Sequence, residues 1–319
     1  MKLKQKTIRS KRNNTNKNIK TNKNIKTNKN IKTNKNIHKK TKKINKFKND
    51  KCAPKKSLEF TCYDKQSLYK LKNAWNKKHP NKKIKSNVPK EIWKKLKYYK
   101  KNSCKRESCW LKQEFIKNNL DYKLKKLTFA PKYPKSWHKN ENEWLNSMDI
   151  LNIFKQYEHK YPKFKFIGPS PIDYDTSTQD GCVWNELCKF NLSDYIQNKK
   201  TKIGIIFNLD THDKGGSHWV ALFIDANKKG IYYFDSYGDK IPTRINNFVK
   251  TVQEQSKILG TTYKYHYNNN RHQYKGSECG MYCLYFIIHM LKNKDFDYFL
   301  KNKISDDAML KLRKQYFNY

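Results

Sequence analysis

The chain has few acidic residues, few glycines and no long hydrophobic run. Only 27 of its 319 residues are Asp or Glu, against 71 Lys or Arg, which gives a formal net charge of +44. No uninterrupted apolar run approaches the roughly 20 residues of a membrane-spanning helix, and no charged-then-apolar leader opens the sequence. We therefore expect a protein that has no membrane segment and is not secreted.

The eight cysteines lack the Cys-x-x-Cys spacing of common zinc sites. Cys104 and Cys109, like Cys182 and Cys188, form close pairs without the second half that a zinc site needs. We therefore expect no metal and no cofactor. We expect a reducing compartment, which would suit a free catalytic thiol.

Positive charge is concentrated toward the N-terminus. Residues 1–50 hold 19 Lys or Arg and one acid, residues 51–130 hold 24 and six, and residues 131–319 hold 28 and 20. Four near-copies of Thr-Asn-Lys-Asn-Ile-Lys fill residues 15–38, with Ile as their only large apolar residue. Because such a segment cannot bury enough surface to order itself, we predict a disordered Lys/Asn-rich tail over residues 1–50.

This tail has two interpretations. Clustered Lys can neutralise phosphates, which favours non-specific binding of nucleic acid by residues 1–50. Lys, Asn and Ile are also all written by A/T-rich codons, so slippage in an A/T-rich genome would leave the same repeat. Both interpretations stay open at this point.

The rest of the chain predicts a small helical arm at residues 51–130 and a larger domain at residues 135–319, separated by a Pro-marked linker. In the larger domain, apolar runs predict strands near residues 203–209, 218–224, 230–235 and 261–267. Helical spacing predicts helices near 146–160, 242–258, 279–293 and 306–316, and residues 144–174 suggest a helix followed by a loop. We expect an α+β fold whose mostly antiparallel sheet packs on the helix that starts at Cys279.

Two β-prone runs, at residues 218–224 and 230–235, predict a hairpin that brings His218 to Asp235. Placing Ile224 opposite Gly230 puts His218 across from Ser236, with Asp235 one residue away. A carboxylate beside an imidazole fixes its tautomer and stabilises the imidazolium, as a general base requires. This pairing predicts half of a nucleophilic active site.

Cys279 supplies the candidate nucleophile. It begins a nearly continuous apolar helical pattern, and a helix N-terminus and a nearby His⁺ both favour the reactive thiolate. Gln273, six residues upstream, can donate an amide N–H to an oxyanion together with the backbone N–H of Cys279. We interpret Cys283, one helical turn further on, as core packing. The ordered set indicates a cysteine peptidase.

Four neighbouring residues are predicted to line the substrate cleft. They are Trp219, Gly276, Glu278 and Gly280. The two glycines would leave room for the main chain of a substrate.

The segment from Phe207 to Met290 resembles the adenovirus protease and SUMO-protease superfamily of cysteine peptidases. The resemblance rests on five short motifs, and it is strongest to the polyprotein-processing proteases of large cytoplasmic DNA viruses such as African swine fever virus. These motifs are Phe207-Asn208-x-Asp210, the run from His218 to Asp225, Tyr233-Phe234-Asp235-Ser236, Arg271-His272-Gln273 and Glu278-Cys279-Gly280. Residues 304–309 also resemble the end of that viral protease. The viral relative has Asn where this chain has Asp235, and either side chain can accept from the imidazole.

The resemblance implies an endopeptidase that cleaves viral structural precursors after Gly-Gly during virion maturation. It also implies a monomer located in the virion and the host cytoplasm, at the viral factory. A ubiquitin- or SUMO-type isopeptidase would share all of this chemistry and is the principal alternative. An acetyltransferase acting on Ser or Thr hydroxyls is a third possibility, and a non-enzymatic basic virion protein is the weakest.

Overall fold

The computed structural model describes residues 48–55 and 57–319. Nearly all of the predicted tail, residues 1–50, and its predicted binding of nucleic acid therefore lie outside the described residues. In the described part of the chain, no helix is both long and apolar enough to cross a membrane.

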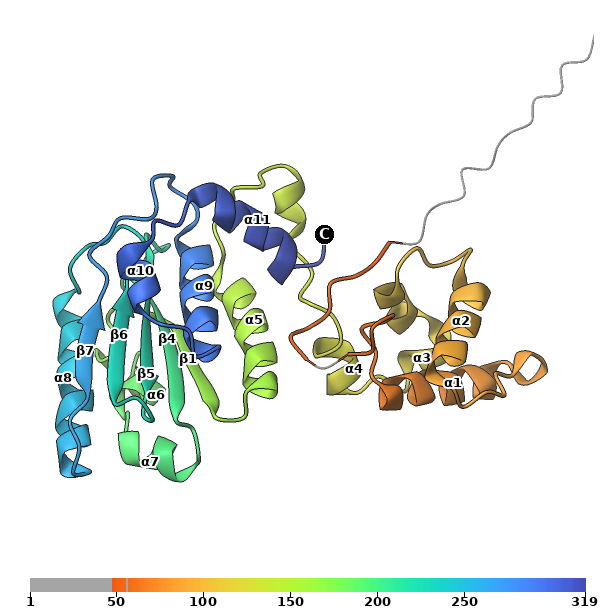
Figure 1. The fold of residues 1–319 in the computed structure, drawn as a ribbon, viewed down its shortest axis with the longest axis horizontal. Coiled ribbons are helices and arrows are strands. Elements are labelled where there is room, and N and C mark those ends of the chain that lie inside the picture. The colour runs from red at the N-terminus through yellow and green to blue at the C-terminus, as the bar shows by residue number, and fades with distance from the viewer. Residues whose placement is uncertain (1–47, 56) are drawn as a thin grey trace, which may run out of the picture. The chain divides into compact units, whose positions relative to one another are not determined.

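A five-stranded sheet in the order β1-β4-β5-β6-β7 forms the centre of the larger domain (Figure 1). Its strands are β1 (Phe164–Pro171), β4 (Lys202–Asn208), β5 (Trp219–Asp225), β6 (Gly230–Phe234) and β7 (Lys264–Tyr267). The central strand β5 runs antiparallel to both of its neighbours, β4 and β6, whereas the edge strands β1 and β7 pair in parallel with β4 and β6. The expected α+β fold with an antiparallel centre is confirmed.

Helices cover both faces of this sheet. On one face, α5 (Ser147–Lys160) and α9 (Cys279–Leu291) share a hydrophobic core with the strands, and α8 (Thr243–Ile258) packs on the other. The helix α11 (Asp306–Tyr316) also contributes to the first core. These four helices agree with the predicted ranges within two residues. Local signals explain α5 and α11, which begin with a capping box at Asn146 and with Ser305 as N-cap.

The strand β1 lies in a segment that we expected to be a loop. It ends in Gly168-Pro169-Ser170-Pro171, a composition typical of turns, yet residues 164–167 pair in parallel with 202–205 before the register shifts at residue 170. Short elements that the sequence did not predict fill the neighbouring connections. These are β2 (Ser177–Thr178), β3 (Gly181–Cys182), α6 (Asn185–Cys188), α7 (Leu192–Gln197) and α10 (Asp297–Lys301).

The predicted register of the β5–β6 hairpin is wrong by one residue. Asp225, not Ile224, lies opposite Gly230. The turn is tighter than we expected because the Asp225 carboxylate accepts the backbone N–H groups of Asn227 and Lys228, at 3.1 and 3.2 Å, and Lys229 adopts a left-handed conformation with φ of 51°. The loops beyond the two strands still bring His218 and Asp235 together.

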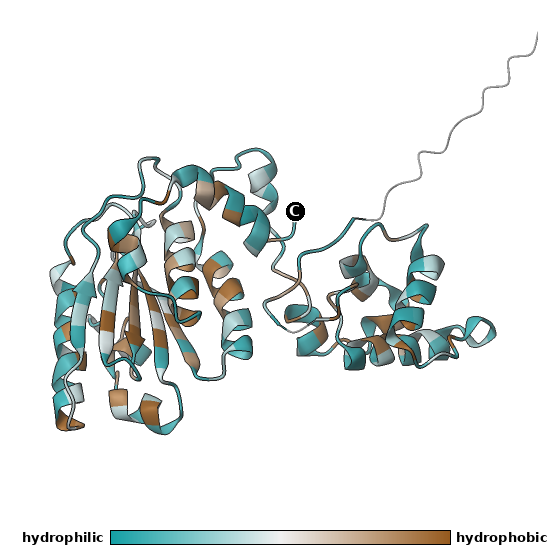
Figure 2. Ribbon diagram, in the orientation of Figure 1, coloured by the Kyte–Doolittle hydropathy of each residue, from teal (hydrophilic) through white to brown (hydrophobic). Residues whose placement is uncertain are grey.

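Residues 57–130 form short helices around a hydrophobic cluster of their own. The helices are α1 (Lys65–Lys78), α2 (Pro89–Lys100), α3 (Glu114–Lys117) and α4 (Tyr122–Lys126), with 3₁₀ turns η1 (Pro80–Lys82) and η2 (Glu107–Lys112). In Figure 2, hydrophobic and hydrophilic residues alternate along these helices. Burial of one face of each helix supplies the main stabilisation of such short helices.

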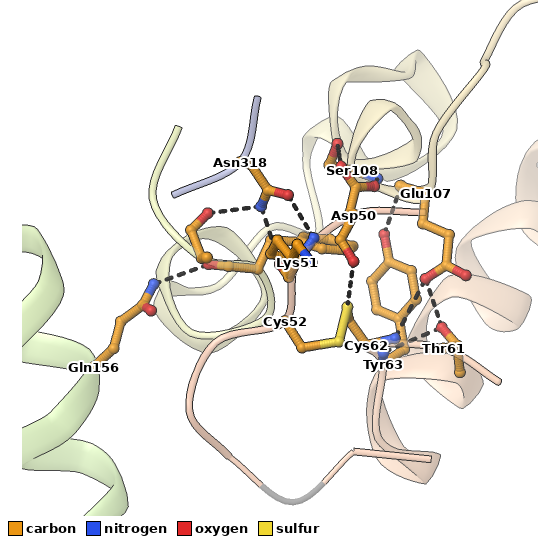
Figure 3. The surroundings of a disulfide bond; sticks show 12 residues. Asp50, Lys51, Cys52, Thr61, Cys62, Tyr63, Glu107, Ser108, Gln156 and Asn318 are labelled. Atoms are coloured by element: carbon orange, nitrogen blue, oxygen red, sulfur yellow. Dashed lines mark hydrogen bonds between the residues drawn. A yellow bond between two sulfur atoms is a disulfide. The ribbon is translucent and has the colours of Figure 1, made fainter. Parts of the chain in front are cut away.

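Asn318, at the end of the chain, joins the residues before α1 to the residues after α4 (Figure 3). Its side-chain amide donates to the carbonyl groups of Lys51 and Ala130, at 3.0 and 2.9 Å, and its Oδ1 accepts the N–H of Lys51. From α5, Gln156 donates to the carbonyl groups of Lys126 and Phe129. The side-chain amides of Asn318 and Gln156 thus supply hydrogen bonds to backbone groups that no regular helix or strand satisfies.

The prediction of a reducing compartment did not anticipate that most of the cysteines are paired in this structure. Six of the eight cysteines form disulfides, and only Cys279 and Cys283 are free. The pairs are Cys52–Cys62, Cys104–Cys109 and Cys182–Cys188. Each pair closes a loop of ten residues or fewer whose Cα atoms lie 5.0 to 6.3 Å apart, within the usual range for a disulfide.

Candidate active site

His218 and Asp235 lie at adjacent ends of the central hairpin. His218 immediately precedes β5 and Asp235 immediately follows β6, so the antiparallel pairing of these strands brings them together. Nε2 of His218 donates to Oδ1 of Asp235 at 2.7 Å. Both residues are buried, His218 with 8% of its surface exposed. With Nε2 bound to the carboxylate, Nδ1 is the ring nitrogen left to accept a proton from a nucleophile.

Two residues that the sequence analysis did not single out hold this pair. Asn268 accepts the N–H of Asp235 at 2.9 Å and donates to its carbonyl oxygen at 2.8 Å. The ring of Tyr237 stacks on His218 with centroids 4.5 Å apart, and its backbone N–H donates to Oδ1 of Asp235 at 2.9 Å. Tyr237 could have been predicted to lie near the site, because it directly follows Asp235 and Ser236 in the sequence. No sequence feature predicts a role for Asn268.

The surroundings of His218 favour the imidazolium. Burial by itself lowers the pKa of His218, but hydrogen bonds to Asp235 and Cys279 and their negative charge more than offset it, and the pKa is raised to about 9. An imidazolium beside a thiol stabilises the thiolate, which is the nucleophilic form of cysteine.

Cys279 is the first residue of α9 and its thiol is free. Only 1% of its surface is exposed. The positive end of the helix dipole lies at this terminus and adds to the stabilisation of a thiolate. Cys283 is also free and buried, but it lies within the helix, its Sγ contacts the carbonyl oxygen of Trp219 at 3.2 Å, and burial raises its thiol pKa well above the ordinary value. The interpretation of Cys283 as core is confirmed.

Gln273 is fully buried in the loop before α9. Its Oε1 accepts from the hydroxyl of Ser236 at 2.7 Å, its backbone N–H donates to the Ser236 carbonyl at 2.8 Å, and its Nε2 donates to the carbonyl of Lys275 at 2.5 Å. Because an amide nitrogen carries two hydrogens, one remains for another acceptor. Ser236 therefore ties the loop of Gln273 to the strand end that carries Asp235.

The four predicted cleft residues have different positions. Trp219 lines the cleft and donates from Nε1 to the Leu145 carbonyl at 3.0 Å. Gly276 has open space where a side chain would be. A Cβ at Gly280 would lie 3.0 Å from Leu145 and 3.3 Å from Trp219, two residues that line the cleft, and the role of Gly280 in the cleft stays a prediction.

The prediction of Glu278 as a cleft residue is wrong. Its carboxylate is buried and pairs with the equally buried guanidinium of Arg313 in α11, with Oε2 3.0 Å from Nε and Oε1 3.1 Å from Nη2. A buried carboxylate needs such a partner. An isolated Glu before Cys279 gives no sign in the sequence of a partner 35 residues away.

A cleft of about 530 Å³ lies next to Trp219. Its walls come from three segments, residues 144–148, 168–171 and 208–216, together with Leu151 and Trp184. Within the described residues, no group of three or more His, Cys, Asp or Glu side chains gathers as a metal site would require.

The raised pKa of His218 predicts the alkaline limit of activity. Since this pKa lies above the ordinary 6.5, the His218 imidazolium predominates at neutral pH and is lost as pH rises through about 9. We expect kcat/KM, measured across pH 5 to 10 on a peptide substrate, to fall near pH 9. Asp235→Ala should move this limit down by about one unit or more.

Asp235→Asn is the matched variant for the same measurement. Its amide oxygen can still accept from the imidazole, so kcat/KM at neutral pH should be higher than for Asp235→Ala. An alkaline limit that stays at the same pH in all three proteins would show that His218 is not the group titrating.

Known proteins resemble this chain over the region that carries these residues. The model of the Ulp1 protease family, C-terminal catalytic domain, matches residues 150–319. A thiol protease of Acanthamoeba polyphaga mimivirus is 40% identical over 177 residues, which are 55% of this chain and 57% of that protein. The chain thus spans little more than half the length of this relative.

A cysteine protease of African swine fever virus is 27% identical over 235 residues, covering 67% of this chain and 83% of that protein. The crystal structure of a protease of the same virus superposes with a TM-score of 0.61 at 22% identity, over 84% of this chain and 95% of that one. The two proteins therefore share their fold. Since the family model covers more than half of the sequence, the chain belongs to the Ulp1 protease family of cysteine peptidases.

Proposed function

We propose that this protein is a cysteine endopeptidase whose nucleophile is Cys279. The observation that carries the proposal is a free thiol at the start of α9 beside an imidazole that is hydrogen bonded to a buried carboxylate. In this assignment His218 transfers the proton, Asp235 orients the imidazole, and Gln273 with the backbone N–H of Cys279 stabilises the oxyanion.

The reaction proceeds by acyl transfer. The Cys279 thiolate attacks the scissile carbonyl carbon, and the electron pair of the C=O bond moves to oxygen as the tetrahedral intermediate forms. The intermediate collapses, and the His218 imidazolium protonates the departing amine. The imidazole then takes a proton from a water that attacks the thioester. A second collapse releases the acid product and restores the thiolate and the imidazolium.

The substrate that this site favours is an extended chain with glycine next to the scissile bond. Cys279 is almost completely covered, and Trp219 and Leu145 pack beside it against Gly280. A main chain without a β-carbon can approach a covered thiol more closely than one with a side chain. We infer cleavage after Gly-Gly for this reason, in agreement with the family resemblance.

Viral precursor polypeptides are the proposed natural substrates. The relatives above come from large DNA viruses, which supports a viral setting, with action in the virion and the host cytoplasm. Relatives in other isolates of African swine fever virus carry the name SUMO-1 cysteine protease, which favours the isopeptidase as second candidate. The two are distinguished by incubating the protein with structural precursors and with modifier-tagged proteins and identifying the new termini by mass spectrometry.

A glycine at P1 should be required. We expect peptides that end in Gly-Gly before the scissile bond to be cleaved, and Gly-to-Ala at P1 to lower kcat/KM by at least about tenfold, roughly 1.4 kcal/mol. The measurement compares two peptides that differ only at P1, with Cys279→Ala as the inactive control. Efficient cleavage after Ala or Leu would contradict the inference that a β-carbon at P1 hinders approach to the Cys279 thiol. Preference for a folded modifier would favour the isopeptidase.

A further inference from the structure

Asp306, at the start of α11, contacts the loop that carries Gln273. Its Oδ2 accepts two consecutive backbone N–H groups, those of Tyr274 at 3.0 Å and Lys275 at 3.1 Å. Its Oδ1 lies 3.1 Å from the hydroxyl of Tyr282, on α9. Only 7% of Asp306 is exposed. The carboxylate thus connects three elements that meet at the candidate site.

These contacts bear on the geometry of Gln273. The side-chain amide of Gln273 donates to the carbonyl of Lys275, and the N–H of that same residue is held by Asp306. Ser236, just after β6, holds the side chain of Gln273, and Asp306, in α11, holds the backbone of the residue that follows Gln273. The contact of Arg271 Nε with the Gln273 carbonyl is local to the loop, so it does not tie the loop to the rest of the fold.

Capping of α11 does not account for the Asp306 carboxylate. The N-cap of this helix is Ser305, whose hydroxyl accepts the N–H of Ala308 at 3.2 Å. Ser305 therefore supplies the side-chain cap of the helix. The carboxylate of Asp306 instead contacts the loop through Oδ2 and Tyr282 through Oδ1. A carboxylate accepting two backbone N–H groups makes strong, directional contacts.

We propose that Asp306 is a positioning residue that sets the oxyanion donor Gln273 through the backbone of Tyr274 and Lys275. The inference rests on the proposed function, in which Gln273 stabilises the oxyanion. Loss of the carboxylate frees two N–H groups and lets the loop relax. A displacement of about 1 Å at an oxyanion donor can cost on the order of 100-fold in rate, although Asp306 itself touches no substrate.

Asp306→Ala in the full chain tests the proposal. We expect kcat for a Gly-Gly peptide to fall by about ten- to a hundredfold with KM changed by less than about threefold, since an oxyanion forms only after substrate binds. The alkylation rate of Cys279 by iodoacetamide should stay within about twofold of wild type, because alkylation needs the thiolate and no oxyanion. Asp306→Asn keeps an accepting oxygen and should recover most of kcat.

Asp307→Ala is the matched control. Asp307 is the next residue of the same helix and reaches the same loop, but its exposed carboxylate pairs with the side-chain Nζ of Lys275, at 3.0 Å, and not with the backbone N–H groups. An exposed pair contributes little, so kcat should stay within about twofold. If Asp306→Ala does not fold, as judged by circular dichroism, Asp306→Ser repeats the test, since serine is polar but one bond too short to reach the loop.

Three outcomes would overturn the proposal. In the first, Asp306→Ala retains kcat within about twofold of an active wild type. In the second, kcat and the alkylation rate fall together, which would make Asp306 a structural residue of the whole site. In the third, the wild type hydrolyses no peptide although iodoacetamide labels Cys279, which would remove the proposed function and this inference with it.

Discussion

Replacing Cys279 by alanine should abolish peptide hydrolysis and leave the fold intact. The change removes one sulfur atom from the first residue of α9, where the thiol makes no disulfide. Loss of a nucleophile that acts with a general base costs on the order of 10⁶ in kcat in a comparable hydrolase. The measurement is steady-state hydrolysis of a Gly-Gly peptide, with thermal unfolding of both proteins as the check on folding.

Cys283→Ala is the control, because it removes the other free thiol of the same helix. Its sulfur is fully buried against β5, so we expect a loss of about 1 kcal/mol in the free energy of unfolding and nearly unchanged kcat. Iodoacetamide should label Cys279 first, since burial raises the pKa of Cys283 well above its ordinary range. Preferential labelling of Cys283, or activity remaining in Cys279→Ala, would refute the assignment.

The sequence was sufficient for the elements whose signal is local. Short apolar, β-prone runs located β4, β5 and β6, and helical spacing located α5 and α11. The contact between His218 and Asp235 also followed from the sequence, because two strands joined by a short loop must be neighbours. The one-residue error in register did not change this contact. His218 lies before the first residue of β5 and Asp235 lies after the last residue of β6, so both are beyond the paired positions.

Elements and contacts that depend on distant partners could not be predicted in this way. The strand β1 pairs with β4 across more than 30 residues, and its Gly-Pro-rich end is typical of a loop. Glu278 was assigned to the cleft because the sequence shows its neighbour Cys279 but not the guanidinium of Arg313. The same holds for Asn268. Its side-chain amide bonds to the backbone N–H and carbonyl of Asp235, and these groups come within its reach only when the sheet has formed.

The cysteines show a different reason for failure. We judged them by the spacing of zinc sites and by the expected compartment, and neither criterion describes which thiols the fold brings together. Cys109 lies within η2, and the chain there brings its Cα to 5.6 Å from that of Cys104. Only the two thiols of α9 stay unpaired among the eight, and one of these is the candidate nucleophile.

Removal of Gln273 should have the second-largest effect on catalysis. We expect Gln273→Ala to lower kcat by about 10²- to 10³-fold, or roughly 2.7 to 4 kcal/mol of transition-state stabilisation, with little change in KM. The remaining donor would be the backbone N–H of Cys279. Alkylation of Cys279 should continue at nearly the wild-type rate, because His218 and Asp235 are untouched.

Ser236→Ala distinguishes the donor from its support. It removes the hydroxyl that holds Oε1 of Gln273 but keeps the amide and the backbone bond between the two residues. We therefore expect a loss in kcat well below that of Gln273→Ala, in the range of one neutral hydrogen bond, about 1 kcal/mol. If Gln273→Ala were no worse than Ser236→Ala in single-turnover hydrolysis, Gln273 would be a packing residue, and the oxyanion would have to be held by backbone N–H groups alone.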